Sequence, residues 1–439
     1  MTLILRAQVD RRIRNVRFDR GVIRQVSPHP MEPIGDEEVI DAGGAALLPG
    51  LHDHHIHLLA TARAQTSIDV RNGLDALTTA PAGSGWIRGV GGDDDLDAAA
   101  LDGLVPDRPV RVQHHSGAMW VLNSAGLAAV DAANASRPGI ERDGQGNPTG
   151  RLWRLDDWLG ARVADEPPDL AALGLQLTAY GITGVTDATP TFGKGAAEIF
   201  RAARLPQLLH FLADQPPPFG VVGPRKIVID DHELPTYDAL REEVADARVL
   251  RRAVAVHCVT REALLLILAV LDEVGSVPGD RIEHAAVMDT DTADRLARLG
   301  VAVVTQPGFI RERGDRYLRD VPEQDLPDLY RYASLLDARV TCVPSSDAPY
   351  GPLDPWAVMR AARDRRSESR APVNVKEWVS ASMVLSGYLR PPGSLHSAPR
   401  QVRAGAPSDL VLLRLPLAEV LDDPRAELVL RTWHAARGS

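Results

Sequence analysis

Four histidines stand within nine residues, Pro49-Gly50-Leu51-His52-Asp53-His54-His55-Ile56-His57, of a chain that has 13 histidines in 439 residues. Successive side chains of a β-strand point to opposite faces, so residues two apart share a face. We therefore expect His55 and His57 to point the same way and to hold one metal ion, because neutral imidazole is a common zinc ligand. His52 and His54 fall on the opposite face and are expected not to be ligands.

Other residues with metal-ligand chemistry stand in or directly after apolar runs that predict strands. In a parallel α/β barrel, the residues that do chemistry gather at the carboxyl ends of the strands. We therefore expect four imidazoles, one lysine and one carboxylate to meet at one rim. Lysine is rare here, with three among 49 basic residues, which marks the one in this group for attention. The six residues are His55, His57, Lys226, His257, His284 and Asp347.

Eight apolar runs predict the strands that would position these side chains. Helix-like stretches such as 237–247 and 290–299 stand between most of them, and this alternation is the signature of a parallel sheet. The predicted fold class is α/β, with a (β/α)₈ TIM-like barrel over residues 49–387. The eight runs are 46–51, 181–187, 207–213, 225–230, 253–258, 280–285, 301–306 and 339–347.

Two further parts complete the predicted domain organisation. Short β-like runs separated by turns near both ends predict a small β-sandwich domain built from residues 1–48 plus 388–439. Residues 60–175 form a connection much longer than usual between the first and second strands. We predict that this segment is an insertion covering the barrel mouth.

Composition excludes several other classes of protein. The chain is 44% hydrophobic and 25% charged, as in ordinary globular proteins, and its net charge of −10 disfavours nucleic-acid binding. Two cysteines, Cys258 and Cys342, do not make a disulfide framework and suit a reducing compartment. The longest apolar run, 263–271, is too short for a membrane span of about 20 residues, and the first residues lack a signal-peptide core.

From these features we expect a cytoplasmic protein whose partner is a small-molecule substrate, with no membrane or nucleic-acid partner. Whether the chain forms a homo-oligomer is left open.

The strand ends resemble those of the metal-dependent amidohydrolase superfamily. Pro49-Gly50-Leu51 followed by Asp53-x-His55-x-His57 is similar to its first-strand signature. The branch it resembles is amidohydrolase family 3, which includes N-substituted formamide deformylases and D-aminoacylase-like enzymes. The other matching segments are His257 after its apolar run, Arg281-Ile282-Glu283-His284-Ala285, Gln306-Pro307, Ser346-Asp347-Ala348-Pro349, Asp354-Pro355 and Trp86-Ile87-x-Gly89-x-Gly91.

This resemblance implies a role for each residue of the rim. His55 and His57 would bind a first divalent metal, and His257 and His284 a second. Lys226 would be an N6-carboxylysine that bridges one or two ions, with zinc the expected metal. Asp347 would ligate the first metal and act as proton shuttle while a metal-activated hydroxide hydrolyses a non-peptide C–N bond in an amide or cyclic amide.

Two segments depart from the family pattern and are expected to face the substrate. Where relatives have Asp-Gly-His before a tryptophan, this chain has His-Ser-Gly ahead of Trp120. After the fourth predicted strand, residues 230–235 replace a glycine-rich run. His115 and Asp231 are the candidate substrate-binding residues in these segments.

Two other functions fit parts of the same pattern. The alternative enzyme is a mononuclear-metal deaminase of a cyclic amidine, which would be favoured by an unmodified Lys226 and a single metal. The other alternative is a non-enzymatic scaffold on the same fold. Scaffolds of this kind typically lose ligands, whereas this chain keeps all six.

Overall fold

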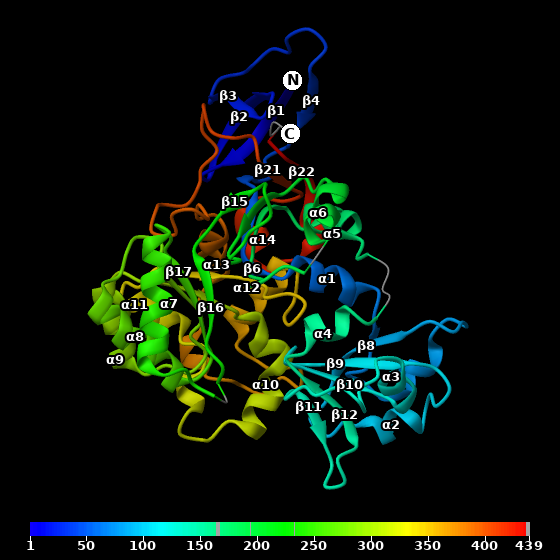
Figure 1. Ribbon diagram of the computed structural model, residues 1–439. Helices are drawn as coiled ribbons and strands as arrows, with labels where there is room; N and C mark the ends of the chain where they lie inside the picture. Colours follow the sequence, from blue (N-terminus) through cyan, green and yellow to red (C-terminus); the bar gives the residue numbers. More distant parts are fainter. Residues whose placement is uncertain (164–166, 194, 232, 436–439) are drawn as a thin grey trace. The chain divides into compact units, whose positions relative to one another are not determined.

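The computed structural model describes residues 1–163, 167–193, 195–231 and 233–435, and Figure 1 shows their course. The chain divides into two compact units: Met1–Leu58 with Ala171–Ser439, and Leu59–Leu170. In the part of the chain that the structure describes, no helix has the length and apolar character needed to cross a membrane. His232, in the segment predicted to face the substrate, and residues 436–439, at the end of the predicted sandwich, lie outside the described residues.

The two ends of the first unit form small sheets whose side chains share one hydrophobic core. Ile4, Phe18 and Leu47 meet Leu410 and Leu412 in this core. Burial of these apolar side chains from both ends stabilises the pairing of the termini. The sheets have the orders β3-β2-β1-β4 and β22-β21-β5, with β1 (Thr2–Val9), β2 (Arg12–Asp19), β3 (Val22–Ser27), β4 (Glu38–Asp41), β5 (Leu47–Pro49), β21 (Leu410–Leu413) and β22 (Val429–Trp433).

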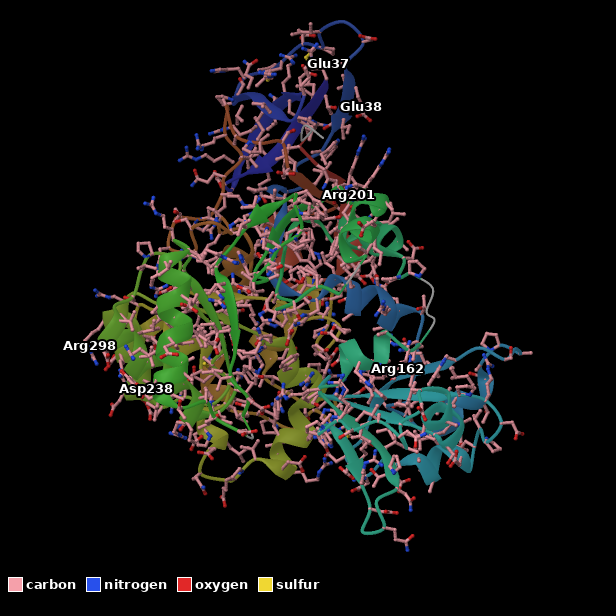
Figure 2. The ribbon with its side chains drawn as sticks, in the orientation of Figure 1. Glu37, Glu38, Arg162, Arg201, Asp238 and Arg298 are labelled. Atoms are coloured by element: carbon pink, nitrogen blue, oxygen red, sulfur yellow. The ribbon has the colours of Figure 1, made fainter. Side chains whose placement is uncertain are left out.

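Ion pairs also join parts of these sheets. Arg17 Nη2 donates to Glu37 Oε1 at 2.8 Å, and the Glu37 carboxylate is buried. Burial opposes ionisation of Glu37, but the Arg17 hydrogen bonds outweigh it and lower the pKa of the carboxyl. Arg431 Nη1 of β22 donates to Glu38 Oε1 of β4 at 2.6 Å. Figure 2 labels both glutamates at this end of the first unit.

Two parallel sheets carry the strands predicted for the barrel. Most of their residues are buried, as expected for strands covered on both faces, whereas both residues of the edge strand β15 are exposed. Neighbouring strands pair in parallel throughout both sheets. One has the order β15-β14-β13-β6 and the other β16-β17-β18-β19-β20, with β6 (Leu51–Ile56), β13 (Ile182–Asp187), β14 (Leu208–Phe211), β15 (Val221–Val222), β16 (Arg225–Val228), β17 (Val254–Cys258), β18 (Arg281–His284), β19 (Ala302–Thr305) and β20 (Cys342–Pro344).

Backbone hydrogen bonds connect the ends of these two sheets. The N–H of Lys226 donates to the carbonyl of Leu212, just after β14, at 2.8 Å. At the other junction, the N–H of Asp347 donates to the carbonyl oxygen of His55 at 2.8 Å. The N–H of His57 donates to the carbonyl oxygen of Ala348 at 2.9 Å. The first and last strands of the predicted set are therefore in contact where the candidate ligands lie.

Helices follow most of the strands and start at recognisable caps. Thr236 and Thr260 accept backbone N–H groups with their side chains at the starts of α7 and α8, as N-cap residues do. Figure 1 shows α7, α8 and α9 side by side outside β16 and β17. Helix α1 (Leu58–Gln65) begins at the boundary and lies in the second unit. The helices of the first unit are α5 (Leu170–Ala179), α6 (Ala196–Ala203), α7 (Tyr237–Val249), α8 (Arg261–Val274), α9 (Thr290–Leu299), α10 (Gly308–Asp320), α11 (Tyr332–Asp337), α12 (Pro355–Asp364), α13 (Ala381–Tyr388) and α14 (Leu417–Asp422), with short 3₁₀ helices at Leu326–Asp328, Val375–Glu377 and Ala426–Leu428.

The start of the first barrel strand differs from its predicted position. Residues 46–51 were expected to form one strand leading into the histidines. Instead, β5 pairs with β21 of the terminal sheet, and a separate strand β6 begins at Leu51 and pairs with β13. The reason is the position of Gly50, where an added Cβ would lie 2.1 Å from Thr183 Oγ1. The chain passes from one sheet to the other at this glycine, and His52–His55 lie inside the strand.

The second unit has its own sheet and its own cores. Its six strands have the order β11-β12-β10-β9-β8-β7. Val110, Val112 and Val121 pack on one side, and Trp120 and Leu152 belong to another cluster. The elements are β7 (Ile68–Asp69), β8 (Ile87–Gly92), β9 (Val110–His114), β10 (Met119–Leu122), β11 (Ile140–Arg142), β12 (Pro148–Trp153), α2 (Ala98–Asp102), α3 (Ser124–Ala129), α4 (Asp156–Gly160) and a 3₁₀ helix at Leu74–Thr79.

A substitution at Gly150 in β12 tests how much the close packing around it contributes to stability. Its φ is +104°, and an added Cβ would lie 2.7 Å from the backbone N of Ala98 and the carbonyl O of Leu122. Because backbone atoms cannot move aside easily, Gly150→Ala is expected to lower the free energy of unfolding by about 1–3 kcal/mol. Denaturant unfolding measures this loss. Gly144→Ala, with no atom within 4 Å of the new Cβ, is the matched control and should leave stability nearly unchanged.

Candidate metal centre

The strand β6 presents its histidines on two faces. His52, His54 and His55 are all buried, and His57 follows directly after the strand ends at Ile56. The rings of His55 and His57 lie close to each other, with their centroids 5.4 Å apart. The local alternation therefore places this pair as the sequence predicts, although His57 lies one residue beyond the strand.

Asp347 lies opposite both of these histidines. Its Oδ1 is 3.4 Å from Nε2 of His55 and 3.4 Å from Nε2 of His57. Burial opposes ionisation of Asp347, but the neighbouring histidines outweigh it and hold the pKa of the carboxyl below its usual range. The carboxylate is therefore ionised at neutral pH and faces two imidazole nitrogens.

His284 and His257 complete a group of histidines beside Asp347. His284 Nδ1 lies 3.9 Å from Asp347 Oδ2, and its ring centroid is 5.1 Å from that of His55 and 4.5 Å from that of His257. Burial lowers the pKa of both histidines, so they are neutral and have a lone pair available for a metal. His284 Nδ1 also lies 2.8 Å from Oε1 of Gln306, which orients the ring.

Two of these residues leave their strands in an unusual backbone conformation. His284 has φ +72° and Asp347 has φ +51°. Positive φ is uncommon for residues other than glycine and costs free energy, and such residues cluster at functional sites. The surrounding packing holds both side chains in the group despite this cost.

Lys226 lies among the same charged residues. It is buried in β16, directly across from Ala255 of β17. Burial lowers the pKa of its ammonium group, while Glu283 and Asp347 act in the opposite direction. Burial thus favours the neutral amine of Lys226 more than water does.

Glu283 also belongs to the centre, although no role was predicted for it. Its carboxylate accepts a hydrogen bond from Nδ1 of His55 and another from Nε of Arg281, and all three side chains are buried. Burial opposes ionisation, but Arg281 and His55 hold the pKa of Glu283 well below its ordinary value. Arg281 also donates to the carbonyl of His54 at 2.8 Å.

This contact selects the tautomer of His55. Burial, the largest influence, lowers the pKa of His55 to about 3, so the ring is neutral and carries one proton. That proton lies on Nδ1 and is donated to Glu283, which leaves the lone pair on Nε2 facing Asp347. Outer carboxylates orient metal-binding histidines in this way. The Arg-x-Glu-His spacing in residues 281–284 was the available sequence signal, but the contact spans 228 positions of the chain.

Replacing Glu283 tests this role. Glu283→Gln removes the anionic acceptor, so zinc affinity is expected to fall about 10–100-fold, as is usual for outer partners of ligating histidines. Competition against a chelator measures the affinity. Glu262→Gln on α8 is the control, and equal zinc affinity in both variants would show that Glu283 does not orient His55.

The remaining two histidines of β6 have structural contacts. His52 Nε2 is 2.8 Å from Thr186 Oγ1, and His54 Nε2 is 3.0 Å from the carbonyl of Gly387. Burial lowers the pKa of His54 to about 3, so this ring is neutral and donates to that carbonyl. These contacts agree with the expectation that neither residue is a ligand.

The two candidate substrate residues lie in different units. Asp231 Oδ1 accepts from the N–H of Thr260 at 3.4 Å and from Thr260 Oγ1 at 3.3 Å. Burial raises the pKa of Asp231, and the electrostatic influence of His284 acts on it in the opposite direction. His115 belongs to the second unit and lies beside Asp94 and His114. Substrate contact by either residue stays a prediction.

The donor set fits a divalent metal. His55 Nε2 and Asp347 Oδ1 are buried side-chain atoms without a hydrogen-bond partner, a costly arrangement unless something else satisfies them. Zinc bonds of about 2.0–2.2 Å in tetrahedral geometry separate neighbouring donor atoms by roughly 3.4 Å. The two contacts of Asp347 Oδ1 with imidazole nitrogens have this separation.

Comparisons with known proteins agree with this chemistry. The chain is 26% identical to an N-substituted formamide deformylase of Arthrobacter pascens, over 91% of this chain and 89% of that protein. An uncharacterized metal-dependent hydrolase from Pyrococcus horikoshii OT3 has the same fold, with TM-score 0.70, 19% identity and coverage of 98% and 97% of the two chains. An atrazine chlorohydrolase variant from Arthrobacter aurescens TC1, solved with zinc, matches with TM-score 0.54, 16% identity and coverage of 98% and 93%.

A match to a family profile shows which protein family the chain belongs to. The profile of the amidohydrolase family matches residues 38–435. That range contains β6 and the strands that carry every candidate ligand. The resemblance predicted from the strand ends is thereby confirmed. This chain belongs to the amidohydrolase family and is a metal-dependent enzyme that acts on carbon–nitrogen bonds.

Proposed function

We propose that this enzyme hydrolyses the C–N bond of an amide or cyclic amide outside peptides, with zinc as the divalent metal. The observation that carries the proposal is the ionised Asp347 among several histidines, where His55 Nε2 and Asp347 Oδ1 have no hydrogen-bond partner. His55, His57 and Asp347 would hold one ion. His257 and His284 would hold a second if two are bound.

The fold that we propose around this centre is a closed (β/α)₈ barrel over residues 49–387. The hydrogen bonds from Lys226 to Leu212 and from Asp347 to His55 support closure, because the first joins β16 to the end of β14 and the second joins the segment after β20 to β6. The core shared by the two terminal sheets supports a sandwich built from 1–48 and 388–439. We further propose that the insertion, 60–175, covers the barrel mouth.

Each residue of the centre has a separate role in the proposed hydrolysis. A bound zinc ion supplies Lewis acidity and lowers the pKa of water to roughly 7. Asp347, ionised because of its histidine neighbours, accepts a proton at its carboxylate and returns it to the leaving nitrogen. Glu283 keeps the proton of His55 on Nδ1, which leaves Nε2 as the donor atom.

Lys226 would serve as an additional ligand after carboxylation. An ammonium cannot bind a cation, whereas a carbamate on the same side chain presents anionic oxygens. The burial of Lys226, which lowers the pKa of its ammonium group, supports this modification. Mass spectrometry under native conditions and electron density at Nζ test it.

The proposed substrate is a small molecule that Asp231 helps to bind, in a cytoplasmic enzyme. A panel of N-acyl amino acids, formamides, hydantoins and lactams tests the proposal on the zinc-loaded protein. Turnover of an amide or cyclic amide that stops on chelation and returns with zinc is the expected result. Release of ammonia from a cyclic amidine, with no amide turned over, would instead identify a deaminase.

A further inference from the structure

A second group of possible ligands lies in the second unit, away in sequence from the residues around Asp347. It consists of Asp94, His114 and His115, and their donor atoms all lie within 4.8 Å of one another. His114 ends β9, which pairs with β8 so that Gly92 stands across from His114. Asp94 follows two residues after Gly92, so the pairing of these two strands brings the carboxylate to both histidines.

The three side chains converge on a single oxygen atom. Asp94 Oδ1 lies 2.9 Å from Nε2 of His114 and 3.7 Å from Nε2 of His115. These separations bracket the roughly 3.4 Å expected between neighbouring donors of a tetrahedral zinc ion.

The backbone turns both rings to the same side. Adjacent residues in a regular strand point to opposite faces, yet the ring centroids of His114 and His115 are only 3.8 Å apart. The strand ends at His114, and a turn follows in which Gly117 has φ +77° and donates its N–H to the carbonyl of His114 at 2.8 Å. The turn therefore brings the two imidazole rings to the same side of the chain.

Ser116 orients the ring of His114. Its N–H donates to His114 Nδ1 at 3.2 Å, its Oγ lies 2.7 Å from the same nitrogen, and Nε2 makes a 2.9 Å hydrogen bond with Asp94 Oδ1. An ion that binds Nε2 would replace the proton there, and the ring would then carry its proton on Nδ1 and donate it to Ser116 Oγ. A hydrogen bond from the second ring nitrogen is the usual support of a metal-binding histidine.

We propose that Asp94, His114 and His115 bind a divalent transition-metal ion, such as zinc, at a site of their own. Two neutral imidazoles and one carboxylate form a donor set that zinc accepts, with water filling the fourth position. The side chain of Asp94 is 65% exposed, so ions reach the site from solvent. In this proposal His115 binds a metal ion and does not bind the substrate. The site shares no residue with the group around Asp347.

Zinc stoichiometry of the full-length protein tests the proposal. Protein stripped with a chelator is dialysed to equilibrium against buffered zinc, and zinc per chain is measured by mass spectrometry. Asp94→Asn and His115→Ala are each expected to bind one zinc ion fewer than wild type. Asp93→Asn, which changes the same residue type in the same exposed loop, should bind as many as wild type.

Wild-type stoichiometry in both Asp94→Asn and His115→Ala would overturn the proposal. Because Asp94 is exposed, its replacement should leave the fold intact, and circular dichroism checks this. The test is independent of the proposed hydrolysis: Asp347→Asn addresses that activity, and its result leaves the comparison of Asp94→Asn with Asp93→Asn unchanged. A zinc-edge anomalous peak beside Asp94 in crystals would give the position of the ion directly.

Discussion

Asp347→Asn is expected to lower kcat by about 10²- to 10⁴-fold, the range typical for loss of a general acid–base group. Asparagine keeps the size of the side chain but cannot accept the proton that Asp347 takes and returns. The backbone should not change, because asparagine tolerates the φ of +51° at this position and the N–H bond to His55 does not involve the side chain. Steady-state kinetics on the best substrate of the panel measures the loss.

The control for this variant is Asp364→Asn at the exposed end of α12. It should match wild type in kcat and KM. A kcat within about twofold of wild type for Asp347→Asn would remove Asp347 from proton transfer, whichever residues bind the metal.

His55→Ala is expected to have the largest effect on metal binding. The substitution removes the Nε2 donor outright, so the loss of zinc affinity should exceed the roughly 10–100-fold expected when an outer partner is lost. It also leaves the buried Glu283 carboxylate with one hydrogen-bond partner fewer, which should cost about 1–3 kcal/mol of stability. Chelator competition and denaturant unfolding measure the two effects separately.

His54→Ala is the matched control because it removes an equally buried histidine from the same strand. This variant should also lose stability, since His54 donates to the carbonyl of Gly387. Its zinc affinity should stay close to that of wild type. Equal zinc affinities for His55→Ala and His54→Ala would contradict the division of β6 into a ligand face and a structural face.

Much of the centre could be predicted from the sequence because its residues sit at strand ends. Alternation along β6 is a local property, so it separated His55 and His57 from His52 and His54. The apolar runs around Lys226, His257, His284 and Asp347 likewise marked strands whose ends a parallel fold brings together.

Other features depend on contacts that no local pattern records. Strand β2 contains several charged residues, and the burial of four successive residues in it, 15–18, depends on its pairing with β1 and β3. The run 46–51 gave no sign that the chain changes sheets at Gly50. Glu283 and the convergence of Asp94 with His114 and His115 depend on pairing between distant strands, so only the structure revealed them.

We expect His55, His57 and Asp347 to hold the metal that this amidohydrolase needs. Zinc-edge anomalous diffraction from crystals of the zinc-loaded protein tests it most directly. We predict a peak within bonding distance, about 2.0–2.2 Å, of Nε2 of His55, Nε2 of His57 and a carboxylate oxygen of Asp347. An ordered site with these three side chains in place and no anomalous peak among them would contradict the account.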